Sequence, residues 1–137
     1  MPKSKKTWVY APHKPAPARA PDDLKTTVQH KADELIKTVL APRHINPPPD
    51  DSNFNYIVAL YAKWYGRYFY FYAKYASPGP YSIAPFFETK FARLEYIGDD
   101  KFNLSFMRHT DDWFESYQNL LLAECLNAIQ NDPWFQP

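Results

Sequence analysis

The sequence has little cysteine, little glycine and no long apolar run, and each shortage excludes a class of protein. The single Cys125 excludes an internal disulfide framework and any zinc site built from several cysteines. No stretch of about 20 uncharged apolar residues is present for a membrane span, and the basic start lacks the apolar segment of a secretory signal peptide. We therefore expect a cytoplasmic protein that does not bind membranes.

Motifs that carry chemistry are also missing. With 3 glycines in 137 residues, the chain has no Gly-rich phosphate loop and no nucleophile elbow. His44, in the proline-rich stretch 41–53, has no His, Cys or paired acid at ligand spacing, so we interpret it as a surface histidine. The sequence thus predicts no cofactor, no metal site and no catalytic residue.

Aromatic and proline residues are present in excess, and the charges are unevenly distributed. Aromatics make up 18% of the chain, and there are 14 prolines. Residues 1–21 carry five of the 16 basic side chains and no acid, which leaves 11 basic and 15 acidic residues in the remainder. Because proline favours extended backbone, we predict a basic, Pro-rich extended tail over 1–21 and a single α+β domain over 22–137.

Two segments have the apolar spacing of helices. The first, over 22–40, is expected to be capped by Asp22 or Asp23 and to end before Pro42. Its apolar side chains fall on one face: Leu24, Val28, Ala32, Leu35, Ile36 and Val39. The second helix is expected over about 119–131, with four side chains pointing inward: Leu122, Cys125, Leu126 and Ile129.

The aromatic run Phe54 to Tyr75 is typical of a β-hairpin that turns at Gly66-Arg67. Eleven of its 22 residues are Phe, Tyr or Trp, and a two-residue turn with glycine first suits a hairpin. A helix is a competing interpretation of the first arm, but the alternating aromatic second arm favours a strand. This turn pairs Trp64 with Phe69 and separates the side chains into two faces. One face holds Val58, Leu60, Ala62, Trp64, Phe69, Phe71, Ala73 and Tyr75, and the other holds Ala59, Tyr61, Lys63, Tyr65, Tyr68, Tyr70, Tyr72 and Lys74.

Three further strands are predicted, over 87–97, 101–109 and 113–118. An even loop at Gly98-Asp99-Asp100 would turn the charged Arg93 into the core, so we expect an odd loop of about three residues with a bulge. Trp113 and Phe114 are adjacent and both apolar, so the pattern assigns no face to the last strand. Short connections imply an α+β fold: a five-stranded antiparallel meander with an N-terminal and a C-terminal helix packed on one face.

The opposite face of this sheet is the candidate binding surface. An antiparallel sheet can leave one face in water, and five tyrosines there exceed what solubility requires. The predicted binding residues are Tyr61, Lys63, Tyr65, Tyr68, Tyr70, Tyr72, Lys74, Arg93 and His109. Alternatively, Trp8 and Tyr10 of the tail, or the proline loop, fold over this face and make it a second core.

Three functions fit such a face. We rank first a non-catalytic binding module that presents the face to a protein partner, or to itself as a homodimer, because aromatic surfaces with Lys and Arg resemble interfaces. The second is binding of single-stranded RNA or DNA through the same face and the basic tail, although acids outnumber bases in the rest of the chain. The third is a small acid–base enzyme that uses Glu95, His109 and Arg93.

Five segments of the chain resemble a family of small bacterial proteins of unassigned function. They are spread over nearly the whole chain and read KKTWVYAP, FNYIVALYAKWY, PGPYSIAPFFETKFARLEY, FNLSFMRHT and DPWF. The resemblance implies a bacterial, cytoplasmic protein, and it assigns no active-site residue.

Overall fold

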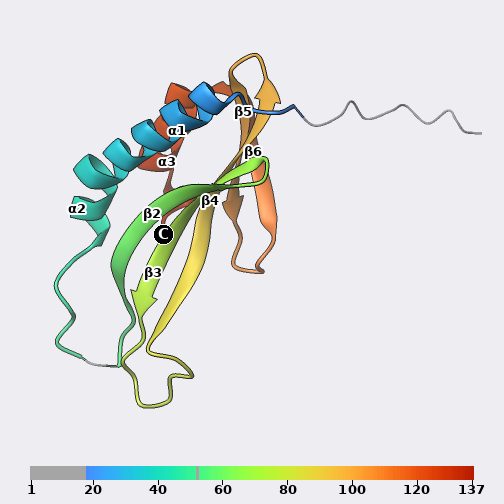
Figure 1. Ribbon diagram of the computed structural model, residues 1–137. Helices are drawn as coiled ribbons and strands as arrows, with labels where there is room; N and C mark the ends of the chain where they lie inside the picture. Colours follow the sequence, from blue (N-terminus) through green and yellow to red (C-terminus); the bar gives the residue numbers. More distant parts are fainter. Residues whose placement is uncertain (1–17, 52) are drawn as a thin grey trace, which may run out of the picture.

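The described part of the chain, residues 18–51 and 53–137 of a computed structural model, forms a helix, a five-stranded sheet and a second helix in that order (Figure 1). The first helical segment consists of α1 (Asp22–Leu35), the π-helical η1 (Ile36–Leu40) and α2 (Ala41–His44). The strands are β2 (Tyr56–Tyr65), β3 (Tyr68–Ala76), β4 (Phe86–Gly98), β5 (Lys101–Met107) and β6 (Trp113–Leu121). The last elements are α3 (Leu122–Asn131) and a short 3₁₀ helix, η2 (Pro133–Phe135).

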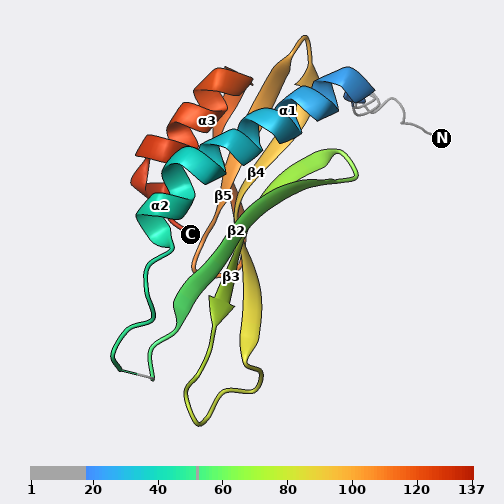
Figure 2. The ribbon, with the colours of Figure 1, turned by 60° about the vertical axis from the view of Figure 1, so that its left-hand side comes forward.

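The sheet is an antiparallel meander with the strand order β2-β3-β4-β5-β6. The helices α1 and α3 lie side by side on one face of this sheet (Figures 1 and 2). Helix α1 contacts β2, and α3 contacts β5 and β6. The predicted α+β fold, a five-stranded antiparallel meander with both helices on one face, is therefore confirmed.

The hydrophobic core lies between the two helices and the face of the sheet that they cover. Its fully buried side chains include Phe69, Phe71, Leu94, Phe102 and Leu104 from the strands and Val28, Leu40, Cys125 and Ile129 from the helices. Ala18 and Ala20, which the sequence interpretation placed in the tail, also pack against this core. Trp8 and Tyr10 lie outside the described residues.

The first helical segment runs further than predicted. Pro42 lies inside it, and the segment ends at His44. A proline ring crowds the carbonyl four residues earlier and donates no hydrogen bond; the wider π-helical turn directly before Pro42 gives the ring room. The predicted cap is also wrong, because Pro21 holds the N-cap position. Asp22 and Asp23 lie in the first turn instead, where their negative charges interact favourably with the helix dipole.

The hairpin of β2 and β3 forms with the predicted turn and register. Gly66 has a φ of 60°, and Trp64 stands opposite Phe69. An extra residue at Val58 forms a bulge, so that Ile57 rather than Val58 packs against the core. The remainder of the predicted separation into an apolar face and a tyrosine- and lysine-bearing face is confirmed.

The turn between β4 and β5 is shorter than predicted, although the faces of the strands are as predicted. Gly98 pairs with Lys101 across the two-residue turn Asp99-Asp100, whose residues have φ values of 52° and 58°. The predicted three-residue loop is therefore wrong. The extra residue that sets which side chains of β4 face the core is Ile97, which forms a bulge. The three side chains expected in the core are therefore buried there: Ala92, Leu94 and Tyr96.

The C-terminal helix begins later than predicted, because β6 continues to Leu121. The Leu121 N–H donates to Glu124 Oε1 at 2.8 Å, which satisfies a free donor at the start of α3. The predicted inward face is confirmed, since Cys125 and Ile129 are buried and Leu122 and Leu126 pack against the core.

Candidate functional site

The face of the sheet that carries no helix is the candidate site, and we call it the tyrosine face. Residues opposite one another in neighbouring strands share a face, so the strand register defines its members. They include Tyr61, Lys63, Tyr65, Tyr68, Tyr70, Tyr72, Lys74, Glu88, Lys90, Arg93, Glu95, Lys101, Asn103, Ser105, Met107, Trp113 and Glu115. Every predicted binding residue except His109 lies on this face.

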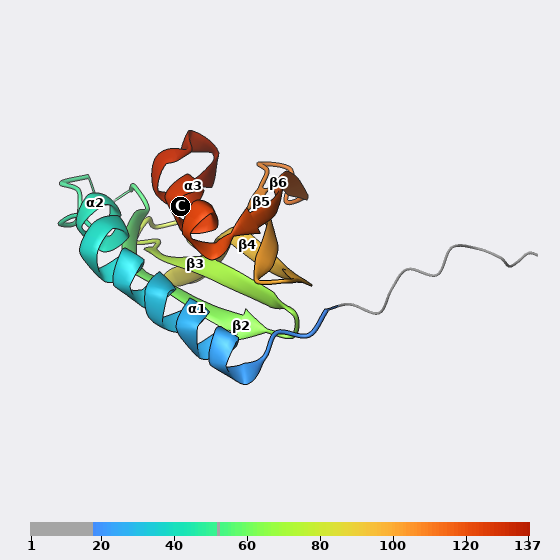
Figure 3. The same cartoon turned by 90° about the horizontal axis from the view of Figure 1, so that it is seen from above.

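The tyrosine face is concave. The ring centroids of Tyr70 on β3 and Trp113 on β6 are 5.8 Å apart, although β4 and β5 separate these strands. In a flat sheet the same two strands would be roughly 14 Å apart. Seen from above, β5 and β6 are turned steeply relative to β2 and β3 (Figure 3). This curvature brings the two rings together on the tyrosine face, where the small Ser105 is buried.

Cations lie over the tyrosine rings throughout this face. The Arg93 guanidinium is held between Tyr68 and Trp113, at 4.5 and 4.7 Å from the ring centroids. Lys90 Nζ lies 4.8 Å from the ring centroid of Tyr70. Each such contact stabilises the fold by roughly 0.5–2 kcal/mol, depending on solvent exposure. The rings therefore fix the positions of the positive charges before any partner arrives.

The lysines of the tyrosine face lack carboxylate partners. Within the described residues the only ion pair joins Arg67 Nε to Glu95 Oε2 at 3.5 Å. Glu88 accepts a hydrogen bond of 2.6 Å from the Tyr61 hydroxyl. Burial and this hydrogen bond raise the pKa of Tyr61 to about 12. Three ammonium groups that lie over aromatic rings thus carry a charge that no carboxylate within 4 Å neutralises: Lys63, Lys74 and Lys90.

Four of the five tyrosines form a continuous cluster, and the fifth is exposed. Tyr61 and Tyr72 stack with their ring centroids 4.7 Å apart, and Tyr70 contacts both Tyr68 and Tyr72. Tyr65 at the hairpin turn is 73% exposed. The rings of the other four are therefore partly covered by one another and by the cations.

The structure does not bring together the three residues predicted for acid–base chemistry. Glu95 stands opposite Asn103, whereas His109 lies beyond the end of β5, six residues further along the chain. Six strand residues span about 20 Å. Arg93 does lie on the tyrosine face, but His109 lines a separate cavity near Phe106.

Two members of the tyrosine face, Lys90 and Trp113, were missed by the sequence interpretation. Lys90 reaches this face because a bulge at Phe91 turns both Phe91 and Ala92 into the core. The adjacent apolar pair Phe91-Ala92 in an alternating strand was the available signal. The sequence pattern assigned Trp113 to neither face. The curvature of the sheet in the structure places its ring beside Tyr70 on the tyrosine face.

The proline-rich connection before β2 does not fold over the tyrosine face, where the alternative prediction placed it. It lies with the β3–β4 loop at the end of the sheet that extends beyond the helices (Figures 1 and 2). The two loops approach each other where the Asn53 carbonyl oxygen is within 4 Å of a side chain placed at Gly79.

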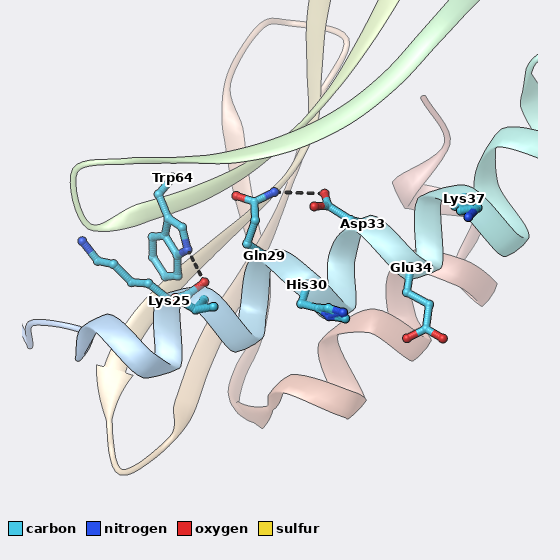
Figure 4. Close-up of a pocket in the computed structure, with 8 residues that line it drawn as sticks. Lys25, Gln29, His30, Asp33, Glu34, Lys37 and Trp64 are labelled. Atoms are coloured by element: carbon cyan, nitrogen blue, oxygen red, sulfur yellow. Dashed lines mark hydrogen bonds between the residues drawn. The ribbon is translucent and has the colours of Figure 1, made fainter.

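A groove of about 780 Å³ lies between α1 and β2, and polar side chains in it hold the helix against the strand (Figure 4). Trp64 Nε1 donates to the Lys25 carbonyl oxygen at 3.2 Å. Gln29 Nε2 donates to the Ala62 carbonyl oxygen at 2.7 Å and to Asp33 Oδ1 at 3.0 Å. The bonds to the Lys25 and Ala62 carbonyl oxygens join the helix to the edge strand, and the bond to Asp33 lies within the helix.

A family comparison matches residues 20–137 to the model described as "Domain of unknown function (DUF3024)". The chain belongs to the DUF3024 family. The match covers both helices and all five strands, so the tyrosine face is part of the DUF3024 domain, and the predicted resemblance to a family of unassigned function is confirmed. No curated protein and no solved structure matches the chain.

Two further findings concern the part of the DUF3024 domain that the structure describes. None of its helices has the length and apolar character needed to cross a membrane. Within the same residues, no three His, Cys, Asp or Glu side chains gather in a way that would hold a metal ion.

Proposed function

We propose that this DUF3024 protein is a non-catalytic binding module whose tyrosine face takes an acidic segment of a protein partner. The observation that carries the proposal is the set of three ammonium groups, on Lys63, Lys74 and Lys90, that lie near aromatic rings without a carboxylate partner. Complementary charge across an interface speeds association and excludes wrong partners. A cytoplasmic location is part of the same proposal.

The aromatic members of the face support this proposal. Tyr, Trp and Arg are the residue types that contribute most to binding free energy at protein interfaces. Here Arg93 is already ordered between Tyr68 and Trp113, so less side-chain entropy is lost when a partner binds.

The charge of the face favours an acidic partner over a second copy of the chain. Six basic side chains on or beside the face, Lys63, Arg67, Lys74, Lys90, Arg93 and Lys101, stand against three acidic ones, Glu88, Glu95 and Glu115. Two copies meeting through this face would bring like charges together. We therefore rank the homodimer below an acidic partner.

Single-stranded nucleic acid remains the alternative, since it is also a polyanion. Bases bind such surfaces by stacking on open aromatic faces, and here Lys90 and Arg93 already lie over Tyr70 and Tyr68. Tyr65 is the one highly exposed tyrosine of the face. This arrangement favours a peptide partner over stacked bases.

Selection from a displayed library of random ten-residue peptides tests the proposal. We expect enriched peptides to be rich in Asp and Glu, and the triple variant Lys63→Gln, Lys74→Gln, Lys90→Gln to bind them at least about tenfold more weakly. The matched control is Lys31→Gln, Lys37→Gln, Arg43→Gln, which removes three exposed positive charges on α1, η1 and α2.

The outcomes of this selection separate the hypotheses. Enriched peptides without acidic residues, or equal binding by both triple variants, would contradict the proposal. Tighter binding of a 20-nucleotide oligo-dT than of any selected peptide would replace it with the nucleic-acid alternative.

A further inference from the structure

A second candidate site lies on the other side of the sheet, where β5 and β6 meet the C-terminal residues. It is a cavity of about 700 Å³, within the range of sites that hold small organic ligands. Phe106, Phe114, Tyr117 and Trp134 line it together with Arg108 and Ser116. The strand register places Phe106 and Phe114 on the face opposite the tyrosine face, so the two sites are separate.

The aromatic walls of this cavity expose more apolar surface than the fold requires. Phe106 is buried and forms the floor. The ring centroid of Phe114 lies 5.3 Å from that of Phe106, and the ring of Trp134 stacks at 5.2 Å. Phe114 and Trp134 are nevertheless 46% and 68% exposed. Two large exposed rings flanking a third are a suitable surface for a planar aromatic group.

Two polar groups of the cavity, the Ser116 hydroxyl and the Arg108 guanidinium, lack partners of their own. Ser116 Oγ is buried and makes no hydrogen bond within the described residues, which is costly unless a ligand or water satisfies it. The Arg108 guanidinium lies 5.7 Å from the ring centroid of Phe114 and has no carboxylate within 4 Å. A hydroxyl and a cation without partners, next to aromatic walls, fit an anionic group attached to a ring.

The Asp132 carboxylate, which lines the cavity, already accepts two hydrogen bonds. Asp132 Oδ2 accepts from the Tyr117 hydroxyl at 2.7 Å, and Asp132 Oδ1 accepts from the Trp134 backbone N–H at 3.1 Å. These bonds hold two walls of the cavity in place. Asp132 therefore positions the aromatic residues and leaves Arg108 to attract a negative charge.

We propose that this cavity binds a small planar aromatic carboxylate. The ring of the ligand lies against Phe114 and Trp134 over Phe106, and its carboxylate pairs with Arg108. The Ser116 hydroxyl donates to the same carboxylate. The tyrosine face and its partner take no part in this site.

Calorimetric titration of the full chain with 2-naphthoate, and with the neutral 2-naphthamide as matched ligand, tests the proposal. We expect saturable binding of 2-naphthoate at one site. Arg108→Gln should weaken 2-naphthoate at least about tenfold and leave 2-naphthamide unchanged, because a hydrogen bond to a charged group is stronger than one to a neutral group. Trp134→Ala should weaken both ligands.

Two controls keep this test decisive. Lys101→Gln, at the opposite end of β5, should change neither affinity. Ser116→Ala removes a hydroxyl that has no partner in the fold, so the variant should stay folded and bind 2-naphthoate about threefold more weakly. Absence of saturable binding, or equal affinity of Arg108→Gln and the natural chain for 2-naphthoate, would overturn the proposal.

Discussion

At the residue scale, Arg93 contacts two aromatic rings of the tyrosine face that belong to different strands. Its guanidinium is stacked between two rings, and its Nε is buried without a hydrogen-bond partner. The contribution of Arg93 to folding therefore comes from planar stacking rather than from hydrogen bonding. Lysine carries the same charge but cannot stack in this way.

We expect Arg93→Lys to lower the free energy of unfolding by about 1 kcal/mol. Urea unfolding followed by tryptophan fluorescence measures this change. Lys31→Arg on the exposed side of α1 is the control and should change stability by less than about 0.5 kcal/mol. Equal stability of Arg93→Lys and the natural chain would show that the stacking does not contribute.

Cys125 is the residue whose reactivity is easiest to predict. It is fully buried in α3, and burial raises the pKa of its thiol to about 12. Because the thiolate is the reactive form, a thiol reagent such as DTNB should leave the folded protein unmodified and react fully in urea. Stoichiometric modification of the folded protein within minutes would contradict the buried position.

At the scale of elements, the hairpin was predictable because two features of its sequence agree. The Gly66-Arg67 turn gives the pairing, and the separation of Phe from Tyr excludes any register that is shifted by an odd number of residues. The single-residue bulges at Val58 and Ile97 were not predictable as positions, because a bulge is selected by how each strand packs against its neighbours. The bulge at Phe91 had a local signal, the adjacent apolar pair Phe91-Ala92.

Features of the helices and strands that depend on local sequence were predictable, and those that depend on packing with distant segments were not. The apolar face of α1 was evident from its period. The π-helical turn before Pro42, and the continuation of β6 to Leu121, depend on packing with distant segments. The tyrosines of the candidate site were predictable from alternation. The position of Trp113 and the separation of His109 from Glu95 were not, because they depend on the curvature of the sheet and on the length of β5.

The hairpin turn provides a test at this scale. Gly66 has a φ of 60° with no atom within 4 Å of a new side chain, so Gly66→Ala should cost only backbone strain, about 1 kcal/mol of unfolding free energy. Gly79 makes only ordinary contacts at 3.7 Å or more, and Gly79→Ala should be neutral or slightly stabilising. Thermal unfolding compares the two, and an equal loss in both would contradict the assigned turn.

At the scale of the whole molecule, the tyrosines couple stability to alkaline pH. The pKa of Tyr61 is raised to about 12, by burial and by the bond to Glu88, and burial raises the pKa of Tyr72 and Tyr75 as well. A raised pKa means that the folded state holds the proton more tightly than the unfolded state. Stability should therefore be unaffected by these groups below about pH 10 and fall as the pH rises from 10 towards 12.

Urea unfolding between pH 8 and 11.5 measures this dependence. Tyr61→Phe should lose less stability over the alkaline range than the natural chain, because one of the linked protons is gone. Tyr65→Phe, at the exposed end of the same face, is the matched control and should retain the full loss. A Tyr61→Phe curve parallel to that of the natural chain would contradict the raised pKa of Tyr61 and its hydrogen bond to Glu88.

The central claim for the whole molecule is that the concave tyrosine face is where the partner binds. The most direct measurement is an amide and indole nuclear magnetic resonance titration of the full chain with a selected acidic peptide. We predict that the shifted signals cluster on Lys63, Lys74, Lys90 and the Trp113 indole. Shifts confined to the α1 groove, or to the loops at the far end of the sheet, would contradict the account.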